Sequence, residues 1–200
     1  MKGVAGLSAG DPPIGCDELA ELARVVARRG IGLGAAYGIA KLAAEGIGRV
    51  AMARALNSTE RRVRRILEAL KSDPKVSRIL PTLAKIVDVE RRQARDVTVT
   101  IYRGLRLELL EAIRRNIVSF RDELVIAVKG PWAFEALGIV EGGAIAFPGM
   151  PEELSASYAE SVGRVEGEGL VVVWRRYRGV SDDAAVVEAL AAFCSRSGTP

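Results

Sequence analysis

The stretch LNSTERRVRRIL, residues 56–67, combines a turn residue, a helix start, an apolar stripe and a cationic face. Apolar side chains recur at helical spacing through this stretch and just beyond it: Val63, Ile66, Leu67 and Leu70. Such spacing predicts a helix with one buried side. At about 100° per residue, Arg61 and Arg65 point away from that side. Arg62 and Arg64 flank it. The sequence therefore predicts a surface helix that exposes guanidinium groups. Such groups suit bidentate contacts with phosphates or guanine edges.

The residues before the cationic helix indicate a second, shorter helix and a tight turn. Residues 49–56 carry apolar side chains that can pack against a core. Asn57 stands where a helix-to-helix turn needs a left-handed residue, a conformation that Asn tolerates better than most residues. Thr59, or Ser58 before it, can cap the next helix by accepting a backbone N–H bond. The predicted order is a short helix, a tight turn and a cationic helix.

This order resembles the helix-turn-helix of winged-helix transcription regulators. The residues at the motif positions are Leu56, Asn57, Thr59, Glu60, Arg61, Val63, Arg64, Arg65, Ile66 and Leu67. Ser58 departs from the family pattern, which more often has an apolar residue there. The resemblance covers residues 34–102 and implies a DNA-binding domain whose cationic helix enters a major groove. The overall plan is also similar to uncharacterised archaeal proteins of this size.

A hairpin is predicted after the cationic helix. Apolar and polar side chains alternate in two stretches, as in half-buried strands, at residues 86–90 and 97–102. Between them lie Arg91, Arg92 and Arg95. The resemblance makes this hairpin the wing, whose arginines would touch phosphates or the adjacent minor groove. The connection is longer than a compact wing needs, and residues 81–85 could instead form an extra helical turn.

The sequence predicts an α+β fold, with an N-terminal winged helix-turn-helix domain followed by a small α/β layered C-terminal domain. The expected divisions are a flexible tail at 1–15, the winged-helix domain with an N-terminal helical extension at 16–103, a connecting or dimerisation helix at 104–119 and the α/β domain at 120–200. In the last domain we expect strands at 124–128, 143–147 and 170–174, and helices at 132–137, 151–162 and from 181 onward. The helix at 104–119 would either join two chains or pack within one.

The charge of the chain is divided between its two halves. The net charge is +4, to which residues 1–71 contribute +5 (12 basic and 7 acidic), residues 72–115 contribute +4 (10 and 6) and residues 116–200 contribute −5 (7 and 12). The acidic part would be repelled by nucleic acid. Polyanion binding is therefore expected in the first half, and a different task in the second.

Composition argues against several functional classes. The chain has no histidine, the commonest general base and metal ligand. Cys16 and Cys194 stand far apart in the chain, so neither a zinc site nor a disulfide framework is expected. The run Gly30–Gly34 follows a helix and lacks the Lys-Ser/Thr ending of a P-loop, so we interpret it as a linker. No apolar stretch approaches the roughly 20 residues of a membrane span. We expect a cytoplasmic protein that is not an enzyme and has no metal or cofactor.

The expected partners are double-stranded DNA, a second copy of the chain and a small effector in the C-terminal domain. The candidate DNA-binding residues are Arg49, Ser58, Thr59, Arg61, Arg62, Arg64, Arg65, Arg91, Arg92 and Arg95. The aromatic residues that either line an effector pocket or fill the core are Trp132, Phe134, Phe147, Tyr158 and Trp174. Two alternatives stay open for the arginines of the cationic helix. They are solvated or paired with the molecule's own carboxylates, or they dock an acidic protein in a winged-helix adaptor that binds no nucleic acid.

Overall fold

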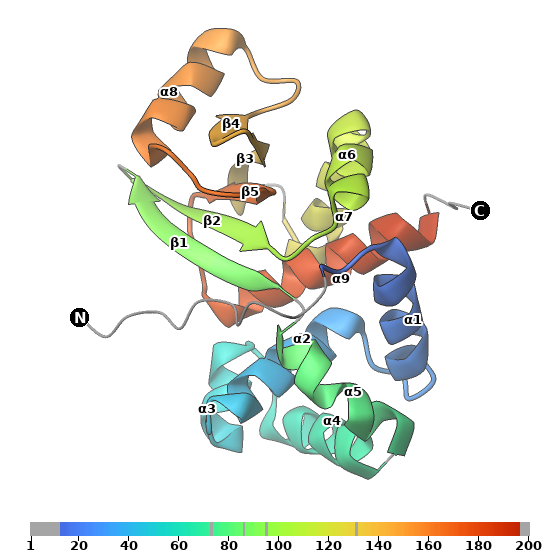
Figure 1. Cartoon of the computed structure of the whole chain (residues 1–200). Helices are drawn as coiled ribbons and strands as arrows, with labels where there is room; N and C mark the ends of the chain where they lie inside the picture. Colours follow the sequence, from blue (N-terminus) through green and yellow to red (C-terminus); the bar gives the residue numbers. More distant parts are fainter. Residues whose placement is uncertain (1–12, 73, 86, 95, 131, 197–200) are drawn as a thin grey trace.

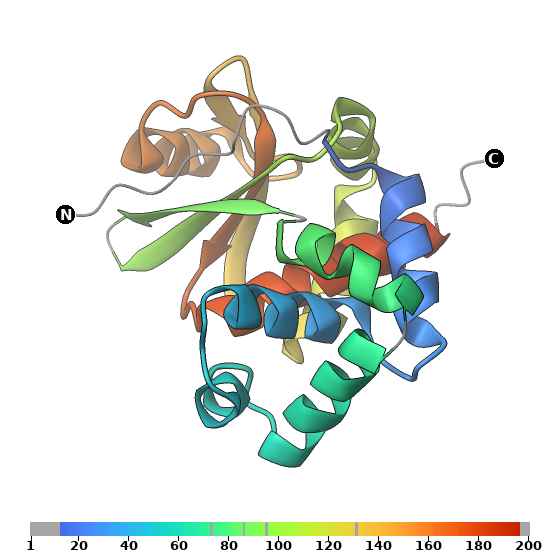
Figure 2. The ribbon, with the colours of Figure 1, turned by 60° about the horizontal axis from the view of Figure 1, so that its bottom comes forward.

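The computed structural model describes residues 13–72, 74–85, 87–94, 96–130 and 132–196 (Figure 1). Its helices are α1 (Cys16–Ala27), α2 (Leu33–Ala44), α3 (Arg49–Ala55), α4 (Glu60–Ser72), α5 (Pro74–Lys85), α6 (Leu107–Arg115), α7 (Ile117–Val128), α8 (Glu152–Val162) and α9 (Val180–Arg196). Its strands are β1 (Asp88–Ala94), β2 (Val97–Arg103), β3 (Phe134–Glu141), β4 (Ala144–Ala146) and β5 (Gly169–Trp174). The mixed α+β class is confirmed. In both views α9 runs between the sheet and the helices of the N-terminal part (Figures 1 and 2).

The sheet is antiparallel throughout and has the strand order β1-β2-β5-β3-β4. Its central strand β5 is the run GLVVVW, and every residue of that run is buried. Successive side chains of a strand point to opposite faces. Val172 and Trp174 accordingly belong to the large core beneath α2, α7 and α9, whereas Val171 and Val173 belong to a smaller core beneath α8. Burial on both faces explains why β5 lacks polar alternation.

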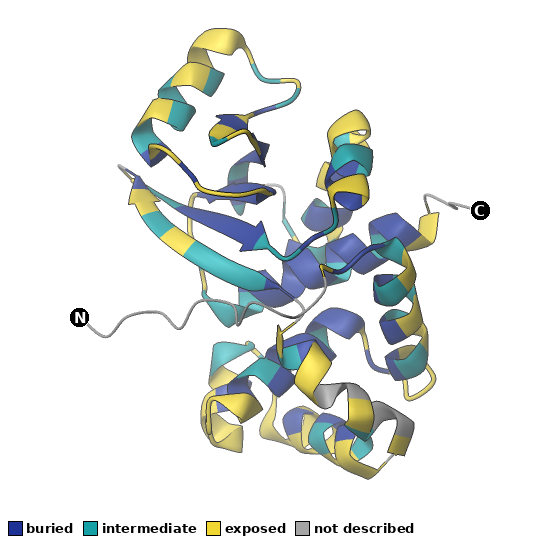
Figure 3. Ribbon diagram, viewed as in Figure 1, coloured by how far each residue is buried: buried dark blue, intermediate teal, exposed yellow. Residues whose placement is uncertain are grey.

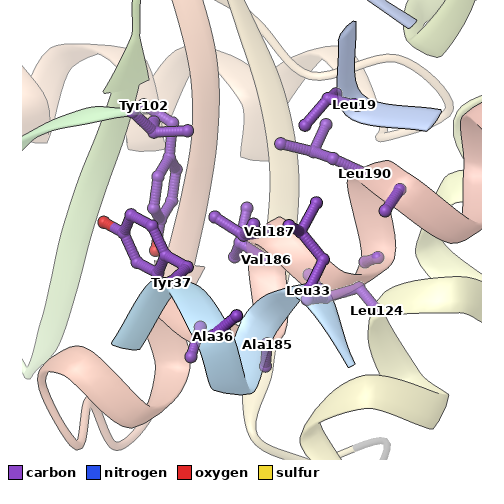
Figure 4. Close-up of a cluster of buried hydrophobic side chains, with 14 of the residues drawn as sticks. Leu19, Leu33, Ala36, Tyr37, Tyr102, Leu124, Ala185, Val186, Val187 and Leu190 are labelled. Atoms are coloured by element: carbon purple, nitrogen blue, oxygen red, sulfur yellow. The ribbon is translucent and has the colours of Figure 1, made fainter. Parts of the chain in front are cut away.

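Helix α2 joins the N-terminal helices to the rest of the molecule because it packs closely on α9. Figure 4 shows Tyr37 and Leu33 of α2 among the side chains of α9, including Val186. The approach depends on glycine: a Cβ added at Gly34 would lie 2.1 Å from the carbonyl oxygen of Ala184. Residues 30–32 of the glycine run do connect two helices, as a linker would, but Gly34 belongs to the close-packed start of α2.

The predicted short helix, turn and cationic helix are all present, as α3, residues 56–59 and α4. Asn57 has φ +46°, the left-handed conformation expected at the turn. The Thr59 hydroxyl accepts the Arg62 backbone N–H at 3.2 Å and thus caps α4. Val63 and Leu70 are fully buried, and Ile66 nearly so. Local sequence therefore positions α4 with its apolar side inward and its arginines outward.

Several predicted elements differ from the structure. Residues 74–85 form helix α5, so the extra helical turn considered at 81–85 is part of a full helix. The expected strand at 124–128 is the end of helix α7, and the expected helix at 132–137 overlaps the start of strand β3. Short apolar runs are compatible with either state, and here tertiary packing decides. α7 is one such case, because it is covered by α9.

The hairpin is present, but it belongs to the main sheet. Strand β1 continues through Arg91 and Arg92 to Ala94, so these two arginines lie within the strand and not at its tip. Strand β2 pairs along its other edge with β5, which follows some seventy residues later, from Thr98 opposite Trp174 to Tyr102 opposite Leu170. The sheet thus crosses the division expected at residue 103, while the domain boundaries themselves stay a prediction.

The expectation against a disulfide framework is wrong. Cys16 and Cys194 form a disulfide, with their Cα atoms 5.1 Å apart. Their separation of 178 residues along the chain is no guide, because α1 packs against α9 and brings the start of the first helix to the end of the last. None of the helices in the described part of the chain has the length and apolar character that a membrane span requires.

Candidate nucleic-acid interface

The outward face of α4 carries the four arginines of the cationic helix, and all four are exposed (Figure 3). Arg61 and Arg65 make no side-chain hydrogen bond or ion pair with any described residue. Arg64 lies 4.0 Å from Glu68, an exposed pair one helical turn apart that contributes little. The two most outward guanidinium groups are therefore available to a polyanion.

The residues around the turn have different roles. The hydroxyl of Thr59 is already used as the cap of α4. Arg49, at the start of α3, lies 4.0 Å from Glu60 at the start of α4, and both side chains are more than half exposed. This contact is at the limit of an ion pair, so it leaves Arg49 able to reach a phosphate. The arginines of α4 and Arg49 thus lie on two adjacent helices.

The arginines of β1 are engaged within the protein. Arg91 donates to the Asp183 carboxylate at 3.0 Å and to the Tyr177 hydroxyl at 2.9 Å. Arg92 donates to the carbonyl oxygens of Val162 and Arg164, each at 2.9 Å, and pairs with Glu90. In both views β1 ends on the side of the molecule where α8 lies, away from α4 (Figures 1 and 2). The structure therefore does not bring these two residues to the α4 face; Arg95 lies outside the described residues.

Arg91 belongs to a buried polar cluster that the sequence did not indicate. The Asp183 carboxylate, fully buried at the start of α9, accepts hydrogen bonds from the hydroxyls of Tyr102 at 3.0 Å and Tyr177 at 2.7 Å. Burial and the neighbouring Asp183 charge raise the pKa of Tyr102 well above its ordinary value. The same two causes raise the pKa of Tyr177. Both tyrosines remain protonated donors, and the cluster ties β1 and β2 to α9.

The five aromatic residues considered for an effector pocket are divided between core and surface. Phe134, Phe147 and Trp174 are buried. Trp132 is 75% exposed, and the guanidinium of Arg175 lies over its ring. Trp132 lines a groove of about 440 Å³ together with the exposed Val118 and Leu154. The Tyr158 hydroxyl donates a hydrogen bond to the carboxylate of Glu135, which also lines this groove. Sequence periodicity alone cannot distinguish an exposed aromatic residue in a short connection from a buried one.

A second hollow lies beside the turn between α3 and α4. This cleft, of about 240 Å³, is lined by Asn57, Ser58 and Arg62 of the α3–α4 segment, and by Lys129, Ser181 and Glu188 from the later part of the chain. We refer to it as the junction cleft, because it lies where the α3–α4 segment meets the C-terminal end of α7 and the first part of α9. Arg62, a flanking residue of α4, therefore faces a different environment from Arg61 and Arg65.

Comparison with known proteins gives little to add. No family model matches the chain, and no curated protein matches it significantly. The chain is similar in structure to the hypothetical protein PH0730 from Pyrococcus horikoshii OT3, with a TM-score of 0.48 and 17% sequence identity over 80% of this chain and 91% of that one. A likeness at this level establishes neither a common fold nor a common activity.

Proposed function

We propose that this protein binds double-stranded DNA and regulates transcription, with α4 entering a major groove as the second helix of a helix-turn-helix. The observation that carries the proposal is which side chains of α4 are buried and which are exposed. Its apolar side is buried, while Arg61 and Arg65 project outward without partners among the described residues. Guanidinium groups in this arrangement suit both phosphate oxygens and the guanine edge. A wing formed by the hairpin is not part of the proposal, because Arg91 and Arg92 are engaged elsewhere.

The test is duplex binding by a variant that lacks both outward arginines. Arg61→Ala with Arg65→Ala is titrated against a mixed-sequence duplex by fluorescence anisotropy at several salt concentrations. Log K falls as log salt rises, and each lost phosphate contact makes this fall less steep by about 0.9. We therefore expect the double variant to have a slope smaller in magnitude by up to about 2. We also expect its affinity at low salt to be at least about tenfold weaker. The matched control is Arg164→Ala with Arg176→Ala, which removes two exposed arginines that lie outside both the α3–α4 segment and the apolar groove.

The outcomes separate the proposal from its alternative. Equal affinity and equal salt slope for the double variant and the unchanged protein would reject the placement of DNA on α4. Absence of any duplex binding by the unchanged protein would favour the adaptor, in which the arginines of α4 dock an acidic protein. A loss of binding by the control variant as large as that of the α4 variant would indicate nonspecific attraction by net charge.

The homodimer stays a prediction, and the apolar groove is where we expect the second copy. Contiguous exposed apolar side chains such as Val118, Trp132 and Leu154 are typical of interaction sites. Arg121 lines the groove from α7, and Glu153 lies beside Leu154 in the first turn of α8. A two-fold axis through the groove would bury the exposed apolar side chains of the two copies against each other. Light scattering of the unchanged protein and of Trp132→Ser would detect such a dimer; a monomer at all concentrations would reject it.

A further inference from the structure

The junction cleft is built from segments far apart in the sequence. The α3–α4 turn supplies Asn57 and Ser58, α4 supplies Arg62, and the residue after α7 supplies Lys129. Helix α9 supplies Ser181 near its start. Polar side chains thus converge on one hollow from both the proposed DNA-binding segment and the C-terminal part, an arrangement typical of small-ligand sites.

Some charged side chains of the junction cleft have partners within the protein, and others have none among the described residues. The Glu188 carboxylate accepts the Gly34 backbone N–H at 2.6 Å, at the start of α2. Arg178 is held by the buried Asp182 through its backbone N–H and its guanidinium. Arg62 and Lys129, by contrast, have no side-chain hydrogen bond or ion pair with any described residue. Two positive charges without a partner among the described residues therefore line the same hollow, where both would attract an anion.

The remaining surface of the cleft limits the ligand further. Ile39, Ala184 and Ala185 line it with apolar atoms. The side chains of Ser58 and Ser181 have no hydrogen-bond partner among the described residues, so their hydroxyls can donate to an anion. A volume of about 240 Å³ admits a small molecule and excludes a macromolecule. A dianionic head group beside the two cations, with a small apolar body against the alanines, fits these properties.

We propose that the junction cleft binds a small organic phosphate monoester, and that the bound ester opposes DNA binding because it engages Arg62 on α4. The second half of this inference rests on the proposed function; the first half does not. The doubly charged phosphate matches Arg62 and Lys129 in number and sign, and hydrogen bonds between ionised partners are the strong ones. Coupling between two sites is reciprocal. Bound DNA would therefore lower the affinity for the ester by the same factor by which the bound ester lowers the affinity for DNA.

The binding site is tested with phenyl phosphate as the probe. Its affinity for the whole chain is measured by isothermal titration calorimetry at constant ionic strength, beside inorganic phosphate. We expect binding of phenyl phosphate that Lys129→Gln weakens at least about tenfold and that the matched charge loss Arg164→Gln leaves unchanged. Circular dichroism establishes that both variants are folded. No binding by the unchanged protein at millimolar probe, or equal binding by Lys129→Gln, would overturn the site.

The coupling is tested separately, with the duplex. Phenyl phosphate should weaken duplex binding by the unchanged protein, and the same concentration should have at least several-fold less effect on Lys129→Gln. Lys129 lies outside the proposed DNA face, so Lys129→Gln alone should bind duplex normally. Probe binding without any effect on the duplex would overturn the coupling. If the chain binds no duplex, the proposed function fails, while the calorimetric result on the cleft still stands or falls by itself.

Discussion

At the scale of single residues, the arginines of this chain fall into two groups that sequence alone does not separate. Arg61 and Arg65 are unpaired among the described residues, whereas Arg92 and Arg103 both bind the carboxylate of Glu90. The contact of Arg103 joins β2 to its neighbour β1 at the edge of the sheet, whereas that of Arg92 lies within β1. An arginine in a basic run is therefore a candidate for nucleic acid only where its own side chain is free.

Glu90 predicts how stability depends on pH. Burial opposes ionisation of this carboxyl, but hydrogen bonds and charge from Arg103 and Arg92 outweigh burial and lower its pKa below the ordinary 4.5. The folded state thus favours the charged form, so its contribution is complete above pH about 4.5 and is lost as the pH falls through the lower folded pKa. We expect the difference in free energy of unfolding between the unchanged protein and Glu90→Gln to shrink from pH 6 to pH 3. Urea unfolding at several pH values measures it, and a difference that stays constant would contradict the assignment.

At the scale of elements, local signals identify α4 and fail for elements that long-range packing determines. The spacing of Val63, Ile66 and Leu70, the left-handed Asn57 and the Thr59 cap all act within one turn and one helix, and each is present. The hairpin pairs with β5, which lies far along the chain, so its sequence resembles that of an isolated wing.

The candidate site follows the same division. The exposure of the α4 arginines could be predicted because helical spacing places them opposite the buried side. The engagement of Arg91 by Asp183 could not, since the two residues meet only when α9 packs beneath the sheet. The junction cleft could not either, because its polar side chains come from the α3–α4 segment, the end of α7 and the start of α9.

The contact between α2 and α9 makes a prediction about glycine. Gly34→Ala places a methyl group 2.1 Å from the carbonyl oxygen of Ala184, so the helices must separate. We expect a loss of at least about 2 kcal/mol in free energy of unfolding, or failure to fold. Gly48→Ala is the control, because nothing lies within 4 Å of its added Cβ and it should cost less than about 1 kcal/mol. Equal stability of the two variants in urea would show that α2 does not approach α9 this closely.

At the scale of the whole molecule, the disulfide between Cys16 and Cys194 joins the first helix to the last. A cross-link that closes a loop of 178 residues restricts the unfolded chain, and loop-closure entropy assigns such a loop about 5 kcal/mol as an upper figure. We expect reduction, or Cys16→Ser with Cys194→Ser, to lower the midpoint of thermal unfolding clearly. Thiol titration of the unreduced, denatured protein checks the bond directly; two reactive thiols per chain would contradict it.

The pairing of β2 with β5 also has a practical consequence for anyone who divides the chain. A recombinant piece beginning at residue 104 would keep β5 but lose the neighbour of its five residues from Leu170 to Trp174. The backbone amides and carbonyls that face β2 would then lie bare along one edge of an apolar strand, and such an edge is a template for intermolecular pairing and precipitation. Expression of the acidic part by itself should therefore begin ahead of β1, at about residue 87, so that the hairpin remains to cover that strand.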